Sequence, residues 1–153
     1  MSIGRYSGEE DQPFITFQEN VAGALDNKEY YLLKYSGNNK VALSAAAGDE
    51  IGISAGKVQN GTTQTDVSVK TLAEGLVRKV KAGGTIADGA WVIGNGDGTV
   101  ITVPTGLIAD ENSVVNTGTF RTALGIAKCP GGAASGDVIA VLIQRTLLVK
   151  KAS

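Results

Sequence analysis

The chain has 153 residues, the length of one ordinary domain, and a formal net charge of −1, with 14 Lys or Arg, 15 Asp or Glu and no His. The absence of His removes the commonest general base near neutral pH and the commonest ligand of transition metals. A single Cys excludes a disulfide within the chain and a zinc site made of Cys alone. Balanced charge disfavours nucleic-acid binding, which usually depends on a basic excess. The composition therefore argues against most classes of enzyme.

Glycine accounts for 21 residues, whereas aromatic residues make up only 5% of the chain. The glycine content is about twice the usual value, so we expect short elements, many turns and a thin core. The N-terminus runs into an acidic stretch without an apolar segment, which argues against a signal peptide. The longest strongly apolar run, residues 138–143, is too short to cross a bilayer. We expect a protein made in a cytoplasm, with no membrane partner.

The first half of the chain reads as strands. Residues 30–35 and 40–43 are β-rich runs on either side of a Ser-Gly-Asn-Asn turn, which predicts a hairpin. Strict alternation over 67–72 and 76–81 predicts two further strands. In the second of these, the alternation places the charged side chains of Arg78, Lys79 and Lys81 at a surface.

The second half continues the pattern. Residues 91–93 and 99–103 flank a Gly-Asn-Gly-Asp-Gly turn and predict a second hairpin. Further strands are expected at 123–127, 138–144 and 147–149. No window of a dozen residues carries an apolar stripe with helical period, so the predicted fold class is all-β.

An internal echo relates the two halves. Segments 25–33, 40–43, 51–54 and 65–69 parallel, in order, segments 86–94, 99–102, 124–127 and 136–141. Two such halves, about 25–72 and 86–144, can close on each other as a small β-barrel or β-sandwich and hide most strand edges. We therefore expect a single β domain over residues 21–153.

Two stretches lie outside the echo. Residues 1–20 are polar apart from a small apolar cluster and are expected to form an extended N-terminal arm. Residues 104–119 are expected to form a long loop in the second half, and loops of this length are usually functional or disordered. Each stretch is either a contact device or, on the simpler interpretation, a frayed terminus and a mobile loop.

Candidate catalytic patterns fail on their surroundings. The glycines at 94–98 lie between two strands, so no helix N-terminus is present to hold a phosphate. Paired acids at 9–11, 49–50 and 110–111 are expected in turns or on opposite faces of strands, and Cys129 has no His to activate it, so it is expected to be a small packing residue. We expect no catalytic residue, no cofactor and no metal.

Basic residues cluster at 78–81 and at Lys150 and Lys151. Few aromatic residues accompany them, so they do not predict a stacking platform for single-stranded nucleic acid. The cluster is either a solvated strand face or an electrostatic contact with an acidic partner surface.

Four short motifs resemble, in order and spacing, the capsid cement (decoration) proteins of tailed bacteriophages. They are VKAGGTIADGA at 80–90, GDGTV at 96–100, ALGIA at 123–127 and GDVIAVLI at 136–143. The stretch from Ile51 to Lys70 is similar to the first half of that family, so the resemblance covers roughly residues 25–145. Residues 104–119 depart from the family pattern as an insertion.

The resemblance implies a structural protein of the virion, made in the host cytoplasm and bound to the outer surface of the phage head. Such proteins form homotrimers at three-fold or quasi-three-fold sites and clamp neighbouring major capsid proteins. The N-terminal arm would then reach a neighbour, with a partner-binding anchor formed by Pro13, Phe14, Ile15 and Phe17. Residues 138–143 are apolar on both faces, so this strand is expected to be covered by the core on one side and by a partner subunit on the other.

The alternative function is a carbohydrate- or receptor-binding β module of a phage tail or cell surface. Such a module needs exposed aromatic rings, and the candidates are Trp91, Tyr30, Tyr31 and Tyr35. Packing of these rings in the core is the competing interpretation. A hydrolase that works with acidic residues alone is a more distant third hypothesis.

Overall fold

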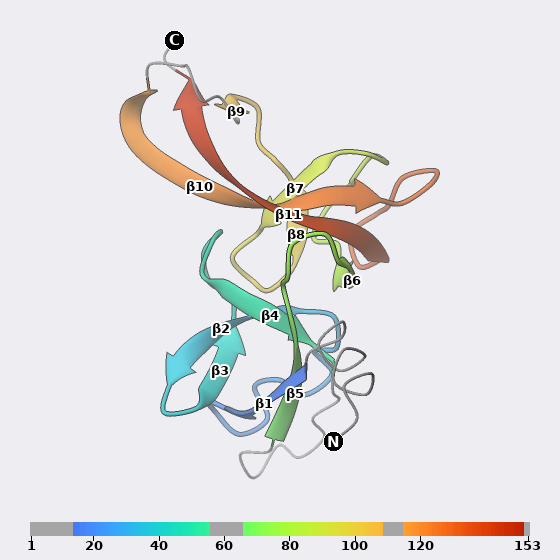
Figure 1. Ribbon diagram of the computed structural model, residues 1–153. Coiled ribbons are helices and arrows are strands. Elements are labelled where there is room, and N and C mark those ends of the chain that lie inside the picture. The colour runs from blue at the N-terminus through green and yellow to red at the C-terminus, as the bar shows by residue number, and fades with distance from the viewer. Residues whose placement is uncertain (1–13, 56–65, 109–114, 152–153) are drawn as a thin grey trace, which may run out of the picture.

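The computed structural model describes residues 14–55, 66–108 and 115–151, and these form β-strands without a helix (Figure 1). The predicted all-β class is confirmed. Within the described ranges there is accordingly no helix of the length and apolar character needed to cross a membrane. The strands are β1 (Phe14–Glu19), β2 (Leu32–Gly37), β3 (Lys40–Leu43), β4 (Glu50–Ser54), β5 (Asp66–Thr71), β6 (Val77–Lys81), β7 (Trp91–Gly94), β8 (Val100–Thr102), β9 (Leu107–Ile108), β10 (Val115–Lys128) and β11 (Val138–Lys151).

The two halves of the chain repeat one topology. The first half is a closed barrel in the order β1-β3-β2-β4-β5. The second half is a sheet in the order β6-β11-β10-β7-β8, with β9 added to β11. Strands β6, β7, β8, β10 and β11 thus have the same neighbours as β1, β2, β3, β4 and β5. The expectation of a fold built from two similar halves is confirmed.

The halves begin earlier than the sequence echo predicts. Residues 14–19, expected in a free arm, form β1 and pair with β5 at five successive positions, from Phe14↔Lys70 to Gln18↔Asp66. β1 is the counterpart of β6, so the halves span residues 14–71 and 77–151 rather than 25–72 and 86–144. The echo missed these strands because their residue types differ, although their pairing is the same.

Residues 104–119 are not one long loop. β9 pairs with β11 through Ile108↔Val149 and Leu107↔Lys150, and β10 begins at Val115, which pairs with Lys151. β10 and β11 therefore extend beyond the body of the sheet, and β9 adds a short third strand along β11 (Figure 1). The composition carried no signal for this extension, because the Asn, Thr and Gly residues of this segment are typical of loops. Val115 and Phe120, on either side of a register irregularity, pair with Lys151 and Val149 of β11.

The first predicted hairpin is present, with a two-residue turn. Asn38 has a φ of 50° and Asn39 a φ of 58°. A type I′ turn requires a positive φ at both of these positions. β2 begins at Leu32, however, and Tyr30 has a φ of 69° outside any strand. Tyr30 N donates to Ser54 O of β4, and its carbonyl accepts a hydrogen bond from Lys81 N in the second half, both at 2.9 Å, so Tyr30 links the two halves.

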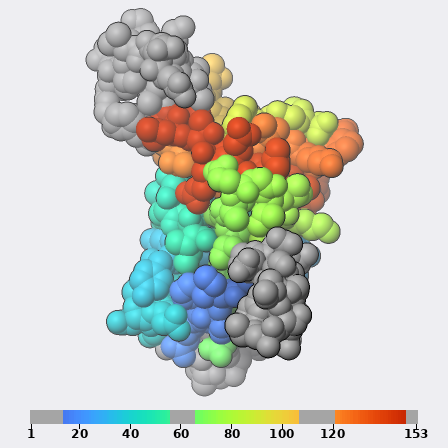
Figure 2. All heavy atoms as spheres, in the orientation of Figure 1, coloured from blue at the N-terminus to red at the C-terminus, as the bar shows by residue number. Residues whose placement is uncertain are grey.

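The halves are joined along a seam between β6 and β8. In the barrel, β1 and β3 close the sheet with two parallel pairs, whereas the corresponding strands of the second half share one bridge, Ala82↔Val100. The segment that begins at Tyr30 lies beside this weak closure, since Leu32 N donates to Gly98 O at 2.7 Å. In the space-filling view the green segment around β6 lies between the blue and cyan barrel and the red strand β11 (Figure 2).

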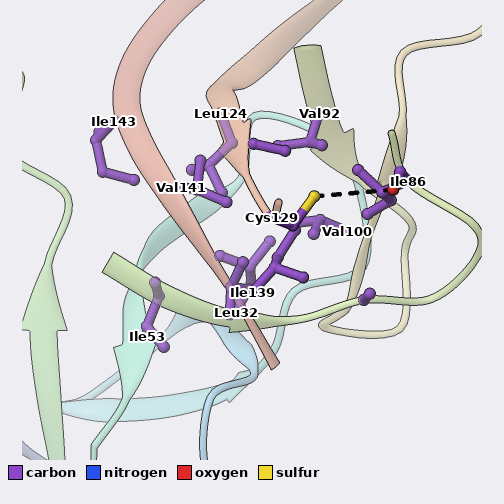
Figure 3. Packing of buried hydrophobic residues seen from close by; sticks show 13 residues of the cluster. Leu32, Ile53, Ile86, Val92, Val100, Leu124, Cys129, Ile139, Val141 and Ile143 are labelled. Carbon is purple, nitrogen blue, oxygen red and sulfur yellow. Dashed lines mark hydrogen bonds between the residues drawn. The ribbon is translucent and has the colours of Figure 1, made fainter. Parts of the chain in front are cut away.

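The largest buried cluster belongs to both halves. Leu32 and Ile53 of the barrel are 0% and 1% exposed and pack with Ile139, Val141 and their neighbours in the second half (Figure 3). The interior of the barrel holds a separate, smaller cluster of Leu25, Leu33, Val41, Val67 and Val69. The halves are thus one structural unit held by a shared core.

Strand β6 corrects one sequence expectation. Lys79 is exposed and Lys81 is partly exposed, as predicted, but Arg78 lies on the inner face and is 8% exposed. Its Nε donates to Thr71 O at 3.0 Å, and burial lowers the pKa of the guanidinium. The alternation of residues 76–81 placed Arg78 on the same face as Val80, so the strand period already predicted its inward direction.

Arg145 of β11 clamps the second half to the barrel. Its Nη1 donates to Glu50 O at 2.9 Å, and its Nη2 lies 3.2 Å from Glu50 Oε1. The Glu50 side chain is fully buried, and its other oxygen accepts a hydrogen bond from Gly48 N at 2.8 Å. A buried carboxylate is stable only when it is paired, and Arg145 supplies the opposite charge for Glu50. The ion pair therefore joins β11 to β4 on this side of the seam.

We predict that Arg145→Met lowers the free energy of unfolding by about 3 kcal/mol, because Glu50 is left buried without its counter-charge. The double variant Glu50→Gln/Arg145→Met removes that charge and is expected to recover more than half of the loss. Urea unfolding at pH 7 measures both. Equal stability of the single and double variants would contradict the clamp.

Gly52 and Gly125 occupy the same position in the two halves. Gly52 pairs with Leu33 and Gly125 pairs with Val92, at equivalent places in β2 and β7. A Cβ on Gly125 would lie 1.9 Å from Leu142 O, a distance that no side chain tolerates. The backbone of β11 therefore approaches β10 so closely that only glycine fits there.

We predict that Gly125→Ala destabilises the fold by about 3 kcal/mol or more, because the backbone of β10 or β11 must move. Gly84→Ala is the matched control, since its nearest heavy atom would be Ile101 Cγ2 at 3.7 Å, and it should change stability by less than about 0.5 kcal/mol. Thermal unfolding of both variants by circular dichroism provides the comparison, and equal melting temperatures would refute the steric argument.

Candidate partner-binding surface

The predicted N-terminal anchor is divided by the fold. Pro13 lies outside the described residues. Phe14 and Ile15 are 54% and 46% exposed on β1. Phe17 packs against the barrel core and meets the ring of Tyr35 edge-on, with 6.1 Å between the ring centroids. Phe14 and Ile15 stay candidates for partner contact, whereas the ring of Phe17 is committed to the barrel.

The aromatic residues proposed for sugar binding are distributed over both halves. Tyr35 is 53% exposed on β2, and its hydroxyl accepts a hydrogen bond from Asn39 N at 3.2 Å. Tyr31 lies under Lys28 Nζ, 4.8 Å from the ring centroid. Trp91 is half-buried on β7, in the other half of the molecule. The rings of Tyr35, Tyr31 and Trp91 therefore belong to separate surroundings rather than to one stacking platform.

The one pair of adjacent acids that the structure describes does not converge. Asp49 accepts hydrogen bonds from Ala45 N and Ala46 N, both at 3.1 Å, whereas Glu50 faces Arg145. The acids at 9–11 and 110–111 lie outside the described residues. Among residues 14–55, 66–108 and 115–151, no three His, Cys, Asp or Glu side chains gather as metal ligands would.

Cys129 packs in the shared core, as the sequence predicts. Its Sγ lies 3.8 Å from Ile86 O (Figure 3), and its backbone N donates to Asp88 Oδ1 at 2.8 Å. Burial raises the pKa of the thiol, and the carboxylate of Asp88 raises it further. A thiol that stays protonated is a poor nucleophile.

The side chain of Asp97 holds the Gly-rich turn at 94–98 together through hydrogen bonds. Asp97 Oδ1 accepts hydrogen bonds from Thr99 N, at 2.9 Å, and from the Thr99 hydroxyl, and Asn95 Nδ2 lies 3.4 Å from Oδ2. Burial raises the pKa of Asp97, but these hydrogen bonds outweigh it and hold the pKa below its usual value. The carboxylate is therefore used to shape the turn.

We predict that Asp97→Ala lowers stability at pH 7 by roughly 1–2 kcal/mol, because Thr99 N and its hydroxyl lose their acceptor. A carboxyl with a depressed native pKa stabilises the fold above its unfolded pKa, and this contribution is lost as the pH falls through the native pKa. The difference between the wild type and the variant should therefore shrink below about pH 4 in urea unfolding series. A difference that stays constant down to pH 2 would contradict the role of the charge.

A row of apolar side chains crosses the outer face of the second sheet. The pairs Val77↔Leu142, Leu142↔Ile126 and Ile126↔Trp91 place these four residues side by side on β6, β11, β10 and β7. Directly paired residues in antiparallel strands point to the same face. Val77 is 52% exposed and Leu142 is 36% exposed, while Ile126 and Trp91 are half-buried. We call these four residues the outer apolar row.

The counterpart of this row in the barrel is an interface. The same pairings join Leu32, Ile53, Lys70 and Phe14 on β2, β4, β5 and β1. Leu32 and Ile53 are buried there because the second half covers them. Two positions of the barrel row thus serve a contact between halves, whereas their counterparts Trp91 and Ile126 are only half-buried.

Residues 138–143 show the same division along β11. Ile139, Val141 and Ile143 are 4% exposed or less, whereas Val138 and Leu142 are 41% and 36% exposed. The core covers one face, as expected, and within this chain the other face is open. The continuous apolar run of the sequence was the signal for this surface, although the residues added by β6 and β10 emerge only from the pairing.

A hollow adjoins the outer apolar row at Trp91. Its volume is about 380 Å³, and it is lined mainly by apolar side chains: Ala90, Trp91, Thr102, Val103, Pro104 and Leu148. Trp91 therefore connects the row on β7 with a shallow apolar depression beside β8.

The comparisons with known proteins found similarity only among solved structures. No family model matches the chain, and no curated protein matches it. Among solved structures, the chain is similar to the head fiber gp8.5 N base of bacteriophage phi29, with 21% identity, a TM-score of 0.49, and coverage of 92% of this chain and 98% of that chain. A likeness of this degree says nothing about the function of this chain.

Proposed function

We propose that the chain is a decoration protein of a tailed-phage head, which binds the outer surface of the capsid as a homotrimer and stabilises contacts between major capsid proteins. The observation that carries the proposal is the outer apolar row, in which Val77 and Leu142 are exposed and Trp91 and Ile126 half-buried, whereas Leu32 and Ile53, the barrel counterparts of Trp91 and Ile126, are buried by the second half. The family resemblance of motifs at 80–90, 96–100, 123–127 and 136–143 supplies the identity of the partner. These motifs include or adjoin strands that build the exposed face.

The binding free energy that this face can supply fits a protein that binds through several copies of the face. Burying the exposed parts of Val77, Val138 and Leu142 contributes on the order of 3 kcal/mol, because each side chain is about half exposed. That amount alone corresponds to millimolar or weaker binding. A trimer that presents three such faces gains avidity, since the later contacts form at high effective concentration. Trimeric assembly thus combines three weak contacts into strong overall binding.

The shared core supports a mechanical role. A clamp transmits force between its contact points, so its parts must not slide. The seam is held by backbone hydrogen bonds, the buried side chains of Leu32 and Ile53, and the Arg145–Glu50 pair. Close-packed protein cores have low compressibility and transmit strain.

The carbohydrate-binding alternative receives less support. Tyr35 is the most exposed of the four candidate rings, and it packs on Phe17 and bonds Asn39. Trp91 faces an apolar hollow rather than a group of polar side chains. Sugar sites combine a stacking ring with several hydrogen-bonding groups, because a sugar presents many hydroxyls.

We predict that the protein is a trimer in solution and cosediments with expanded heads of the phage that encodes it. Light scattering after size exclusion and sedimentation of mixed heads and protein are the measurements. A monomer without affinity for expanded heads would refute the proposed function.

Leu142→Asp is expected to reduce head binding at least ten-fold, because it places a charge in the middle of the outer apolar row. Val21→Asp is the matched control, since Val21 is 58% exposed in the first half and away from the row. Circular dichroism verifies that both variants fold. Equal loss of binding in the two variants would contradict the assignment of the row.

A further inference from the structure

Charge is segregated between the strands and the turns of the second half. β6, β7, β8, β9, β10 and β11 contain no Asp or Glu, but they carry Arg78, Lys79, Lys81, Arg121, Lys128, Arg145, Lys150 and Lys151. The barrel strands are balanced instead, with Lys34, Lys40 and Lys70 against Glu19, Glu50 and Asp66. The second sheet is thus strongly cationic although the whole chain has a net charge of −1.

Three of these cations lie beside the outer apolar row. The pairs Lys79↔Ala140 and Ala140↔Lys128 form the next row across β6, β11 and β10, and Lys81↔Val138 lies beyond it. Paired side chains two residues apart along a strand share a face, so these lysines project on the same side as Leu142. Strand spacing places the Cα atoms of Lys79 and Lys128 about 10 Å apart, and those of Lys79 and Lys81 about 7 Å apart.

The three lysines are not neutralised within the described chain. Arg145 is paired with Glu50, and Arg78 is buried on the inner face. For Lys79, Lys81 and Lys128, no carboxylate of the described residues lies within ion-pair distance. Asp137, next to Val138 in sequence, accepts a hydrogen bond from Ala134 N at 2.8 Å. The positive charge of this face is therefore available to a partner.

We propose that the outer face of β6, β11, β10 and β7 docks onto an acidic protein surface in which carboxylates flank an apolar strip. The lysines would meet the carboxylates while Val77, Leu142 and Ile126 cover the strip. The inference rests on the proposed function, and it specifies the chemistry of the head surface that the protein binds: acidic side chains about 10 Å apart beside exposed apolar residues.

A protein partner fits this face better than a nucleic acid does. The lysine rows alternate with Ala140 and Val138 and border Leu142, so nearly every cation has an apolar neighbour. A phosphate backbone offers nothing to cover these apolar side chains. The rows themselves contain no aromatic residue for base stacking.

Binding to expanded heads tests the inference through the double variant Lys79→Glu/Lys128→Glu. We expect at least a ten-fold loss of affinity at 50 mM NaCl, because the face then repels the carboxylates that it attracted. The wild type should bind several-fold more weakly at 300 mM than at 50 mM NaCl, and the variant should lose this salt dependence. Lys28→Glu/Lys34→Glu, on the first half, is the matched control and should bind as the wild type does.

The outcomes separate the inference from the proposed function. If the wild type binds heads and Lys79→Glu/Lys128→Glu binds equally well, the docking chemistry is wrong and the decoration role stands. If the wild type does not bind heads, both are wrong.

A 20-base-pair DNA duplex is the second probe, and binding to it that depends on Lys79 and Lys128 would overturn the acidic protein partner in favour of a nucleic acid. Unchanged circular dichroism spectra and melting temperatures exclude misfolding as the cause of any loss.

Discussion

The packing of Leu32 and Ile53 into the second half is the interaction on which the rest of the structure depends. Within the described residues the second sheet closes through one bridge, Ala82↔Val100, so its core would be open along the gap between β6 and β8. The barrel covers this gap with two large side chains and with backbone hydrogen bonds at Tyr30 and Leu32. Without that contact, the cluster around Val141 and Ile139 would face water. A chain with few aromatic residues thus obtains an adequate core by sharing one between two repeats.

This contact also makes the two repeats unequal. A row of four paired positions runs across each half, and the barrel uses Leu32 and Ile53 of its row to bind the second half. The second half has no further repeat to bind, so the equivalent Trp91 and Ile126 are only half-buried, next to the exposed Val77 and Leu142. Repeat architectures commonly need a polar cap at their last unit, because an uncapped apolar face invites association. Here the last face keeps its apolar row, and this is the physical reason to assign it to a partner.

The sequence predicted the parts of the fold that local patterns determine. Turn residues such as Asn38 and Asn39, the alternation of 76–81 and the repeated Gly52 and Gly125 correctly indicated strands, hairpins and two similar halves. The first strand of the barrel and the extension of β10 were missed, since they are held by pairing with distant strands rather than by their own composition. The strand period implied that Arg78 points inward. The prediction instead followed the usual preference of charged side chains for solvent and placed Arg78 at the surface.

The candidate surface was harder to predict for a related reason. Formal charge treats every carboxylate as a free charge, yet several acids of the described residues bond to the backbone: Glu19, Asp49, Asp88, Asp97 and Asp137 each accept hydrogen bonds from main-chain N–H groups. A glycine-rich chain with many turns has many such groups to satisfy, and acidic side chains of turns satisfy them well. Lysines offer no acceptor and remain on the strands. The near-zero net charge that argued against nucleic-acid binding therefore conceals a cationic face, and it is the strand register, not the composition, that brings Lys79, Lys81 and Lys128 together.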